Sequence, residues 1–510
     1  YMADAYGKLT GEPGIAFCTR GPGATNASIG LHTAYQDSTP MILFIGQVSL
    51  DVIDREAFQE LDYRRMFGQV AKWVAQIDRA DRIPEYVARA FQTATSGRMG
   101  PVVLVLPEDM LQEQVELKKL PRYRRTQAWP AAQDMTALAN ILTQARKPIA
   151  LLGGTGWTPD ACAQFERFAQ RWDLPVVTEY RFQDVFDNHH AQYAGEIGPT
   201  SSQVLLERVK QADLVLAIGL RLSEGTTRGY TLINAPQPHQ RLVHVHPGSE
   251  ELGSVFRGEL LIQASAPAFC AGLEALYTPN GSMAWAGEAA KLHDAYLLHS
   301  EPVPAPHARM DLAKVVRTME QMLPPDAIVT EGAGNYAGWW QRYFRHRGLS
   351  SGRRNQLAPS NGSMGYGVPS AVAAKLAYPE ATVVSVSGDG CFMMNGQEVA
   401  TALQHEAPVI FIVVNNGMYG TIRAHQGMHY PGRSVGTILR NPDFAALARA
   451  YGAQGFSIER TEEFADAFAA ALACGTSALI EIRIDPDTIN TRTTLSAIEA
   501  KAHASRAPAS

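Results

Sequence analysis

Two stretches of the sequence place oxygen-bearing side chains directly after runs of apolar residues. Ser387 to Asn395 reads SGDGCFMMN, and Pro408 to Gly420 reads PVIFIVVNNGMYG. Asp389 offers a carboxylate, Asn416 an amide oxygen, and the loop that follows a backbone carbonyl, which we assign to Met418. Three such oxygens suit Mg²⁺, which is usually bound through one or two carboxylates together with substrate phosphates. These residues therefore predict a magnesium site.

The glycines around Asp389 extend this prediction to a phosphate ligand. Gly388 and Gly390 lack side chains, so the backbone amides of Gly390 and Cys391 can approach phosphate oxygens closely where a helix begins. Each motif alone is also typical of an ordinary turn. Because 24 residues separate Gly390 from Asn415 and both motifs end apolar runs, the joint pattern favours a site for a metal-bridged diphosphate.

A strand, a helix and a second strand are needed to position these loops. The segment between the motifs contains Asn395 and Glu398, which resemble a capping pair, followed by a helical stripe of apolar residues. In a right-handed parallel crossover both strands end at the same edge of the sheet, where open α/β folds bind ligands. We therefore expect Asp389 and Asn416 to be neighbours.

Similar apolar, β-branched runs recur along the whole chain and alternate with helical patterns. Continuous apolarity marks strands that are covered on both faces, which implies parallel sheets with helical crossovers and an α/β fold class. The predicted strands are Gly14 to Cys18, Pro40 to Ile45, Val102 to Leu106, Ile149 to Leu152, Leu214 to Ile218, Leu242 to Val245, Ala327 to Val329, Thr382 to Val386, Val409 to Val414 and Leu479 to Ile482.

The length of 510 residues predicts about three domains at roughly 150 residues each. Two stretches rich in Pro, Gly and charge, at 111–134 and 278–307, indicate surface linkers. We expect three domains, each a mainly parallel sheet with helices on both faces, and a small, polar tail that is mobile. Their bounds are 1–120, 135–277 and 305–490, with the tail at 491–510.

Charge and cysteine content narrow the kinds of partner. The net charge of -5 and the absence of a long Lys/Arg run argue against a nucleic-acid or anionic-membrane surface, and no apolar run approaches the roughly 20 residues of a membrane span. The five cysteines lie far apart without a CxxC motif, which predicts neither a zinc site nor a disulfide framework and fits a cytoplasmic protein. The opening YMADAYGKLTGEPG resembles the middle of a helix, so we expect the true N-terminus to be missing.

The spacing of GDG and NN resembles the signature of the thiamine diphosphate (ThDP) enzymes. Other segments resemble the acetolactate synthase branch of that family in order and spacing over essentially the whole chain. They are GPGATN at 21–26, GQV at 46–48, AFQE at 57–60, AKW at 71–73, ATSGRMGPVVLVLPED at 94–109 and GSMGYGVPSA at 362–371. The resemblance implies the ThDP-binding fold, with a pyrimidine-binding (PYR) domain, a central domain and a diphosphate-binding (PP) domain in that order.

The resemblance also implies roles for residues outside the two motifs. Met364 matches the apolar wedge that bends the cofactor, and Gly362 matches the carbonyl that holds its 4'-amino group. Bending brings the 4'-imino nitrogen against thiazolium C2, so that this internal base removes the C2 proton. Gly334 and Asn335 match a loop with further diphosphate contacts, although a plain glycine-rich turn remains an alternative. The resemblance also assigns Tyr419 and Gly420 to the cofactor site.

Pro22 and Asn26 match a loop that family members set against the aminopyrimidine ring. In the family this loop and the diphosphate motif come from different subunits, so the resemblance implies a homodimer or homotetramer with sites at the interface. The glutamate that activates the cofactor would lie upstream of Tyr1, and Glu12 is too far downstream to replace it. Either the sequence is incomplete at its start or this carboxylate is lost.

Substrate-side positions give a less definite picture. Gln59 and Lys72 match polar positions of acetolactate synthases, although a surface lysine before a tryptophan is commonplace. His425 stands where these enzymes carry a tryptophan that shapes the choice of acceptor. An imidazole can donate, accept or carry charge near neutral pH, which an indole cannot. The acceptor is therefore open, and a solvated loop histidine is the alternative.

The central domain resembles a nucleotide-binding domain only at its start. PIALLGGTGW at 148–157 has the form of a glycine-rich turn after a strand, and acetolactate synthases hold FAD in this domain. Arg221 is kept, but their next arginine falls on Gly225 and their aspartate on His246. Because a lone GGxG is a weak signal and decarboxylases of the family keep this domain empty, FAD is not favoured.

The resemblance implies a transferase or lyase. Activated C2 of the cofactor adds to the carbonyl of a 2-oxo acid, the thiazolium accepts electrons as CO₂ leaves, and the resulting enamine is protonated or adds to a second carbonyl. Acetolactate synthesis from pyruvate is the leading interpretation. The alternatives are a decarboxylase or 2-hydroxy ketone lyase of the benzoylformate decarboxylase or benzaldehyde lyase type, a flavin or nicotinamide oxidoreductase, and a non-catalytic cofactor-binding scaffold.

Overall fold

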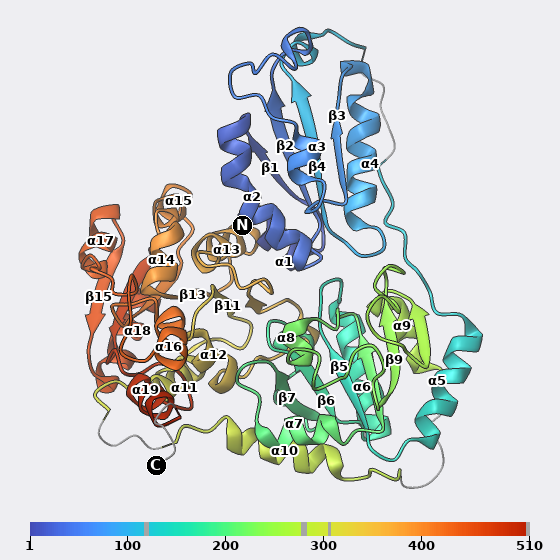
Figure 1. Cartoon of the computed structure of the whole chain (residues 1–510), viewed down its shortest axis with the longest axis vertical. Helices are drawn as coiled ribbons and strands as arrows, with labels where there is room; N and C mark the ends of the chain where they lie inside the picture. Colours follow the sequence, from blue (N-terminus) through green and yellow to red (C-terminus); the bar gives the residue numbers. More distant parts are fainter. Residues whose placement is uncertain (117–121, 277–282, 304–307, 506–510) are drawn as a thin grey trace. The chain divides into compact units, whose positions relative to one another are not determined.

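A computed structural model describes residues 1–116, 122–276, 283–303 and 308–505 (Figure 1). The chain divides into two compact units, one of residues 1–179 and 207–289 and the other of 180–206 and 290–510. Both expected linkers lie partly outside the described residues. Three parallel sheets with flanking helices are present, which confirms the predicted α/β class with three sheet-based domains.

The first sheet belongs to the N-terminal part of the first unit. Its strand order is β1-β2-β4-β3, and all pairs are parallel. Side chains of β2 alternate between two cores, because Met41 and Leu43 pack with α2 and α3 whereas Ile42 and Phe44 pack with α4. The elements are α1 (Met2–Thr10), β1 (Gly14–Cys18), α2 (Gly21–Gln36), β2 (Met41–Gln47), α3 (Tyr63–Phe67), β3 (Trp73–Gln76), α4 (Ile83–Thr95) and β4 (Pro101–Pro107).

The second sheet forms the rest of the first unit. Five of its strands lie in the order β10-β9-β8-β5-β6, again parallel. Its elements are α5 (Ala132–Gln144), β5 (Pro148–Leu152), α6 (Pro159–Trp172), β6 (Val176–Glu179), β8 (Leu214–Ile218), α8 (Glu224–Thr227), β9 (Arg241–His246), β10 (Leu260–Gln263) and α9 (Ala266–Glu274). Two helices, α7 (Gln203–Lys210) and α10 (Glu288–His299), cross the unit boundaries.

The third sheet carries the second unit and has the order β12-β11-β13-β14-β16-β15. One face packs on α11, α12 and α18 through a core that includes Trp340 and Phe468, and α13 packs against β11 and β13. Besides the strands of this sheet, the second unit contains β7 (Tyr193–Ile197) and several helices. In chain order its elements are β7, α11 (Leu312–Met322), β11 (Ile328–Glu331), α12 (Ala337–Tyr343), β12 (Gln356–Leu357), α13 (Gly367–Ala377), β13 (Val383–Gly388), α14 (Asp389–Asn395), α15 (Glu398–Gln404), β14 (Ile410–Asn415), α16 (Gly420–His429), α17 (Phe444–Tyr451), β15 (Gln454–Ile458), α18 (Phe464–Ala473), β16 (Ala478–Arg483) and α19 (Leu495–Ala504).

Two local expectations differ from the structure. The proposed cap is wrong: α14 begins at Asp389 and ends at Asn395, whose side-chain amide donates to the Gly365 carbonyl at 3.0 Å instead of capping a following helix. In the segment assigned to a mobile tail, the described residues form α19, which packs on α16.

The described residues include no helix long and apolar enough to cross a bilayer. All five cysteines are described, and none of them forms a disulfide.

Candidate cofactor and metal site

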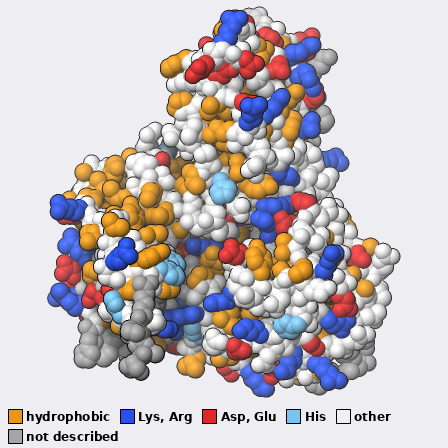
Figure 2. Space-filling view, viewed as in Figure 1, with side chains coloured by type: hydrophobic (Ala, Val, Ile, Leu, Met, Phe, Trp, Pro, Cys, Tyr) orange, Lys and Arg blue, Asp and Glu red, His pale blue; other side chains and the backbone are white. Residues whose placement is uncertain are grey.

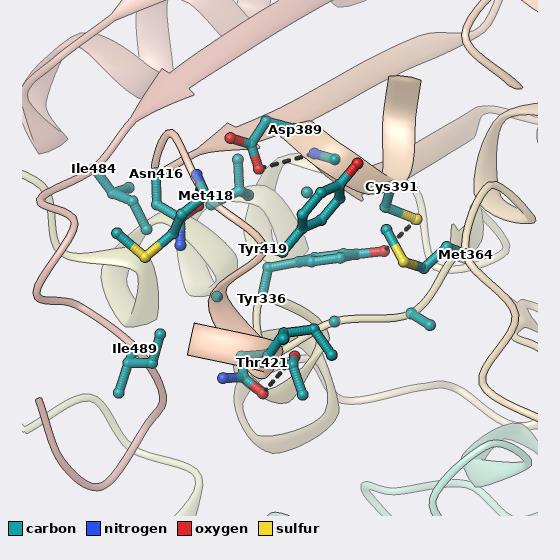
Figure 3. Close-up of a pocket in the computed structure, with 18 of the residues that line it drawn as sticks. Tyr336, Met364, Asp389, Cys391, Asn416, Met418, Tyr419, Thr421, Ile484 and Ile489 are labelled. Atoms are coloured by element: carbon teal, nitrogen blue, oxygen red, sulfur yellow. Dashed lines mark hydrogen bonds between the residues drawn. The ribbon is translucent and has the colours of Figure 1, made fainter. Parts of the chain in front are cut away.

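The two polar motifs emerge from adjacent strands of the third sheet. β13 and β14 pair in parallel with Gly388 opposite Val414, so the loops that follow them leave the same edge of the sheet. Asp389 and Asn416 consequently line one cavity of about 230 Å³ (Figure 3). The structure thus brings the two residues together as expected from the crossover.

Asp389 is almost fully buried and is held by backbone amides. The Gly390 N–H donates to its Oδ1 and the Gly417 N–H to its Oδ2, both at 2.9 Å. Burial raises the pKa of Asp389 above its usual value, and hydrogen bonds from Gly390 and Asn441 partly oppose this rise. Among the described residues Asp389 has no ion-pair partner, so a divalent cation would supply the missing positive charge.

The loop after β14 supplies neutral oxygens beside this carboxylate. Asn416 Oδ1 accepts the Met418 N–H at 3.2 Å, and Gly417 adopts a left-handed backbone conformation with φ of +70°. The described residues contain no group of three or more His, Cys, Asp and Glu side chains that could hold a metal ion. A metal here would therefore depend on one carboxylate with amide and carbonyl oxygens, the ligand type that Mg²⁺ accepts.

Glycines keep the cavity open where the two loops approach aromatic rings. A Cβ on Gly390 would lie 2.6 Å from Cε1 of Tyr419, and one on Gly388 would lie 2.9 Å from Cδ1 of Tyr336. Neither position has room for a side chain unless these rings move. The two glycines of GDG are thus required by packing around the cavity.

Tyr336 links three segments that surround the cavity. Its hydroxyl accepts the Gly332 N–H at 3.0 Å and donates to Cys391 Sγ at 3.5 Å, and the Gly365 N–H donates to the same sulfur at 3.2 Å. Burial raises the pKa of Tyr336 well above its usual value, so the hydroxyl keeps its proton for this hydrogen bond. The loops after β11 and before α13 are fixed to α14 in this way.

The other residues predicted for the PP domain also line this cavity. Gly334 and Asn335 border it after β11, and Asn335 Oδ1 accepts the Thr421 hydroxyl at 3.0 Å. Met364 is half-buried against the sheet core, next to Gly362, whose φ of +66° favours glycine. The predicted residues that share the cavity are Gly334, Asn335, Gly362, Met364, Gly388, Asp389, Gly390, Cys391, Asn416, Met418, Tyr419 and Gly420.

Four predicted site residues lie elsewhere. Pro22 and Asn26 are in the first turns of α2, and Gln59 lies in the loop after β2 with a strained φ of +66°. All three belong to the first unit. His425 lies on α16, is exposed, and stacks on His429 with 6.2 Å between ring centres. It is one helical turn beyond Thr421, which borders the cavity.

The side chain of Lys72, which we matched to a substrate-side position, forms hydrogen bonds to backbone carbonyls of its own domain. Its ammonium donates to the carbonyls of Thr93 and Ser96 at 2.6 Å each, at the end of α4. Burial lowers the pKa of Lys72 to about 8. These contacts tie the start of β3 to the C-terminal end of α4, which is the role the structure gives this side chain.

Sequence reasoning missed several residues of the cavity. Trp339 and Ile422 on α12 and α16, and Ile484, Thr488 and Ile489 after β16, also border it. Asn441 donates from its side-chain amide to Asp389 Oδ2 at 2.7 Å. Ala333, Tyr336 and Thr421 carried a local signal, since each is adjacent in sequence to a predicted residue.

An acidic residue and an amide at the carboxyl ends of neighbouring parallel strands lie where open α/β folds bind their ligands, which places this chain among α/β proteins with a candidate ligand site at that sheet edge. Three family models match the chain. They are the thiamine pyrophosphate enzyme N-terminal TPP binding domain at residues 1–66, the central domain at 135–273 and the C-terminal TPP binding domain at 332–482.

Curated relatives agree with this assignment. A probable acetolactate synthase large subunit of Methanocaldococcus jannaschii is 30% identical over 95% of this chain and 84% of its own length. Large subunits from Parasynechococcus marenigrum, at 31% over 95% of this chain and 79% of the relative, and from Escherichia coli (isozyme 3), at 30% over 92% and 83%, are similarly close. The chain belongs to the thiamine pyrophosphate enzyme family.

The resemblance found in the sequence is thereby confirmed, and the protein is a ThDP-dependent enzyme. Decarboxylation of 2-oxo acids with carboligation, the main interpretation of the sequence, is favoured over an oxidoreductase or a non-catalytic scaffold.

Proposed function

We propose that this enzyme decarboxylates a 2-oxo acid and transfers the remaining acyl unit to a second carbonyl compound, as an acetolactate synthase does with pyruvate. The observation that carries the proposal is the convergence of Asp389, Asn416 and the glycine loops on one cavity. The names of the similar proteins, acetolactate synthase large subunits, support the choice of reaction.

In this proposal Mg²⁺ and ThDP share the cavity of the second unit. Asp389, Asn416 and the Met418 carbonyl would hold the metal, and the Cys391 amide with the Gly334–Asn335 loop would hold the diphosphate, joined by the Gly390 amide only if it leaves Asp389 Oδ1. Met364 and Gly362 would orient the rings, with Tyr419 and Gly420 completing the wall. When bound, the cofactor supplies the carbanion and the electron sink, while these residues bind it, orient it and exclude water.

The first unit would complete the site through a second copy of the chain. Pro22, Asn26 and Gln59 are the residues we propose for its side of the cofactor and substrate. Exposed apolar side chains support a homodimer or homotetramer: Phe17 of β1 is 72% exposed, and Ile438 near the β14 loop is 82% exposed. Apolar side chains also gather on the visible surface of the second unit (Figure 2). We propose the domain bounds 1–120, 135–277 and 305–490 for this arrangement.

We infer that the glycine turn of the central domain does not hold FAD. A Cβ on Gly154 would lie 2.2 Å from the Gly219 carbonyl oxygen, and one on Gly153 would lie 2.8 Å from Glu179 Oε2. The Trp157 indole N–H donates to the Gly153 carbonyl at 2.9 Å. These glycines are thus packed against the chain's own groups, among them the buried Glu179 carboxylate. We propose an enzyme without flavin, which an absorbance spectrum of the purified protein tests.

His425 favours a second candidate, a decarboxylase or 2-hydroxy ketone lyase. The side chain is exposed on α16 where acetolactate synthases carry tryptophan, so an acceptor there would meet an imidazole. Purified full-length protein should be assayed with Mg²⁺, ThDP and a panel of 2-oxo acids for CO₂ and for acyloin. CO₂ with acetolactate from pyruvate supports the main proposal. CO₂ with aldehyde alone supports a decarboxylase, and cleavage of a 2-hydroxy ketone, added to the panel, into two aldehydes without CO₂ supports a lyase. No product from any 2-oxo acid or 2-hydroxy ketone rejects both candidates.

A further inference from the structure

Asn441 reaches the metal site from a segment that lies outside both polar motifs. It precedes Pro442 and α17 in a stretch that is tied to the loop after β14. The Leu439 N–H donates to the Gly417 carbonyl at 2.8 Å, and the Tyr419 N–H donates to the Thr437 carbonyl at 2.9 Å. These backbone bonds bring Asn441 to the ends of β13 and β14.

The side-chain amide of Asn441 joins the two strand ends. Its Nδ2 donates to Asp389 Oδ2 at 2.7 Å and to Asn415 Oδ1 at 2.9 Å. An amide nitrogen carries two hydrogens, so both donors are used. Asn415 is itself fixed, because its Nδ2 donates to Oε1 of the buried Glu481 on β16 at 2.7 Å.

These hydrogen bonds fix the orientation of the Asp389 carboxylate. Oδ2 accepts from Asn441 at 2.7 Å and from the Gly417 N–H at 2.9 Å, whereas Oδ1 accepts from the Gly390 N–H at 2.9 Å. With donors from two different segments on Oδ2, the carboxylate cannot rotate without breaking them. Oδ1 is then the oxygen presented to a cation.

We propose that Asn441 is a positioning residue for the metal: it orients Asp389 so that this carboxylate can bind a divalent cation that carries a diphosphate. This inference rests on the proposed Mg²⁺ and ThDP site. Ligating carboxylates are themselves hydrogen-bonded in metal sites, and loss of such an outer partner typically lowers metal affinity by about 10–100-fold.

The test is calorimetric titration of full-length protein with ThDP at graded Mg²⁺ concentrations. Asn441→Ala removes both donors, and we expect the Mg²⁺ concentration for half-maximal ThDP binding to rise at least about tenfold, with full binding recovered at high Mg²⁺. Asn441→Asp keeps the shape but places a second carboxylate against Asp389, so it should shift the Mg²⁺ requirement at least as far. Asn441→Asp also tests the positioning role of Asn441 if Asn441→Ala does not fold.

Two further variants separate the possible causes. Asp443→Ala removes the neighbouring N-cap of α17, whose Oδ1 accepts the Ala446 N–H at 2.8 Å, and should lower stability without changing the Mg²⁺ requirement. Asp389→Ala should abolish the Mg²⁺ dependence. If the wild type itself shows none, the proposed metal site is wrong. If Asp389→Ala behaves as expected but both Asn441 variants match the wild type, only the role of Asn441 is overturned.

Discussion

The Gly417 N–H donates a hydrogen bond to Asp389 Oδ2 at 2.9 Å. This bond joins the loop after β14 to the first residue after β13. Because the two strands are adjacent and parallel, the contact follows directly from their register. Asp389 and the Gly417 loop are therefore held together by the chain itself, and under the proposed function this lowers the cost of ordering them for the cofactor.

Asp389→Asn should abolish tight, Mg²⁺-dependent ThDP binding while the protein stays folded. The amide keeps the size of the carboxylate but removes the charge that attracts the cation, so the loss should exceed the roughly 100-fold typical of outer-sphere changes. Calorimetric titration with ThDP and Mg²⁺ measures it. Asp443→Asn is the matched control, because asparagine also caps a helix. Equal ThDP affinity of the Asp389 variant and the wild type would remove Asp389 from the metal site.

Gly390→Ala should damage the site through a single methyl group. The new Cβ would lie 2.6 Å from Tyr419 Cε1, so the ring must move and carry the adjoining loop with it. We expect a loss of about 1–3 kcal/mol in the free energy of unfolding, together with weaker ThDP binding. Thermal denaturation and titration measure the two effects.

Gly46→Ala provides the comparison for this change. No atom lies within 4 Å of a Cβ at Gly46, so its melting temperature should stay near that of the wild type. If Gly390→Ala has the melting temperature and the ThDP affinity of the wild type, the Tyr419 ring does not restrict the space at Gly390.

Much of this arrangement is predictable because it depends on local pattern. The central strands β2, β4 and β14 contain continuous apolar runs, β13 reads VVSVSG and is likewise buried, and the two motifs directly follow β13 and β14. The strands β3, β6, β7, β10, β12 and β15 were not predicted; WVAQ of β3 and QGFSI of β15, for example, mix polar and apolar residues. Asn441 reaches Asp389, and Ile489 reaches the cavity, only through tertiary packing, so no spacing in the sequence connects them with Asp389.

The loop after β11 is supported by a buried ion pair that makes a further prediction. Arg181 Nη1 lies 3.2 Å from Glu331 Oε2 and donates to the Gly332 carbonyl at 3.3 Å. Burial raises the pKa of Glu331 above its usual value, and the charge of Arg181 opposes that rise. Arg181→Met leaves an uncompensated buried carboxylate and should cost about 3–5 kcal/mol of unfolding free energy.

Adding Glu331→Gln to Arg181→Met should recover part of that loss, because the second change removes the isolated charge. Denaturant unfolding of the wild type, both single variants and the double variant gives the coupling between the two sites. Strictly additive losses would mean that the pair does not act as a unit.

Lys72 gives a prediction for pH dependence. Burial lowers its pKa to about 8 in the folded protein, against 10.5 when it is unperturbed. Between pH 8 and 10.5 the unfolded chain therefore binds a proton that the folded chain has released. The contribution of Lys72 to the free energy of unfolding must therefore increase with pH across that interval. The methionine side chain of Lys72→Met cannot titrate. As the pH rises, the melting temperature of the wild type should therefore increase relative to that of the variant.

The comparison is made as melting curves of both proteins at several pH values from 7 upward. The methionine variant also loses the donors to the Thr93 and Ser96 carbonyls, but that loss is nearly the same at each pH and shifts the whole curve. The change with pH in the difference between the two melting temperatures thus reports the titration of the ammonium group. The size of that difference at a single pH does not. Parallel curves would show that Lys72 keeps an ordinary pKa, and that its hydrogen bonds outweigh the penalty of burial.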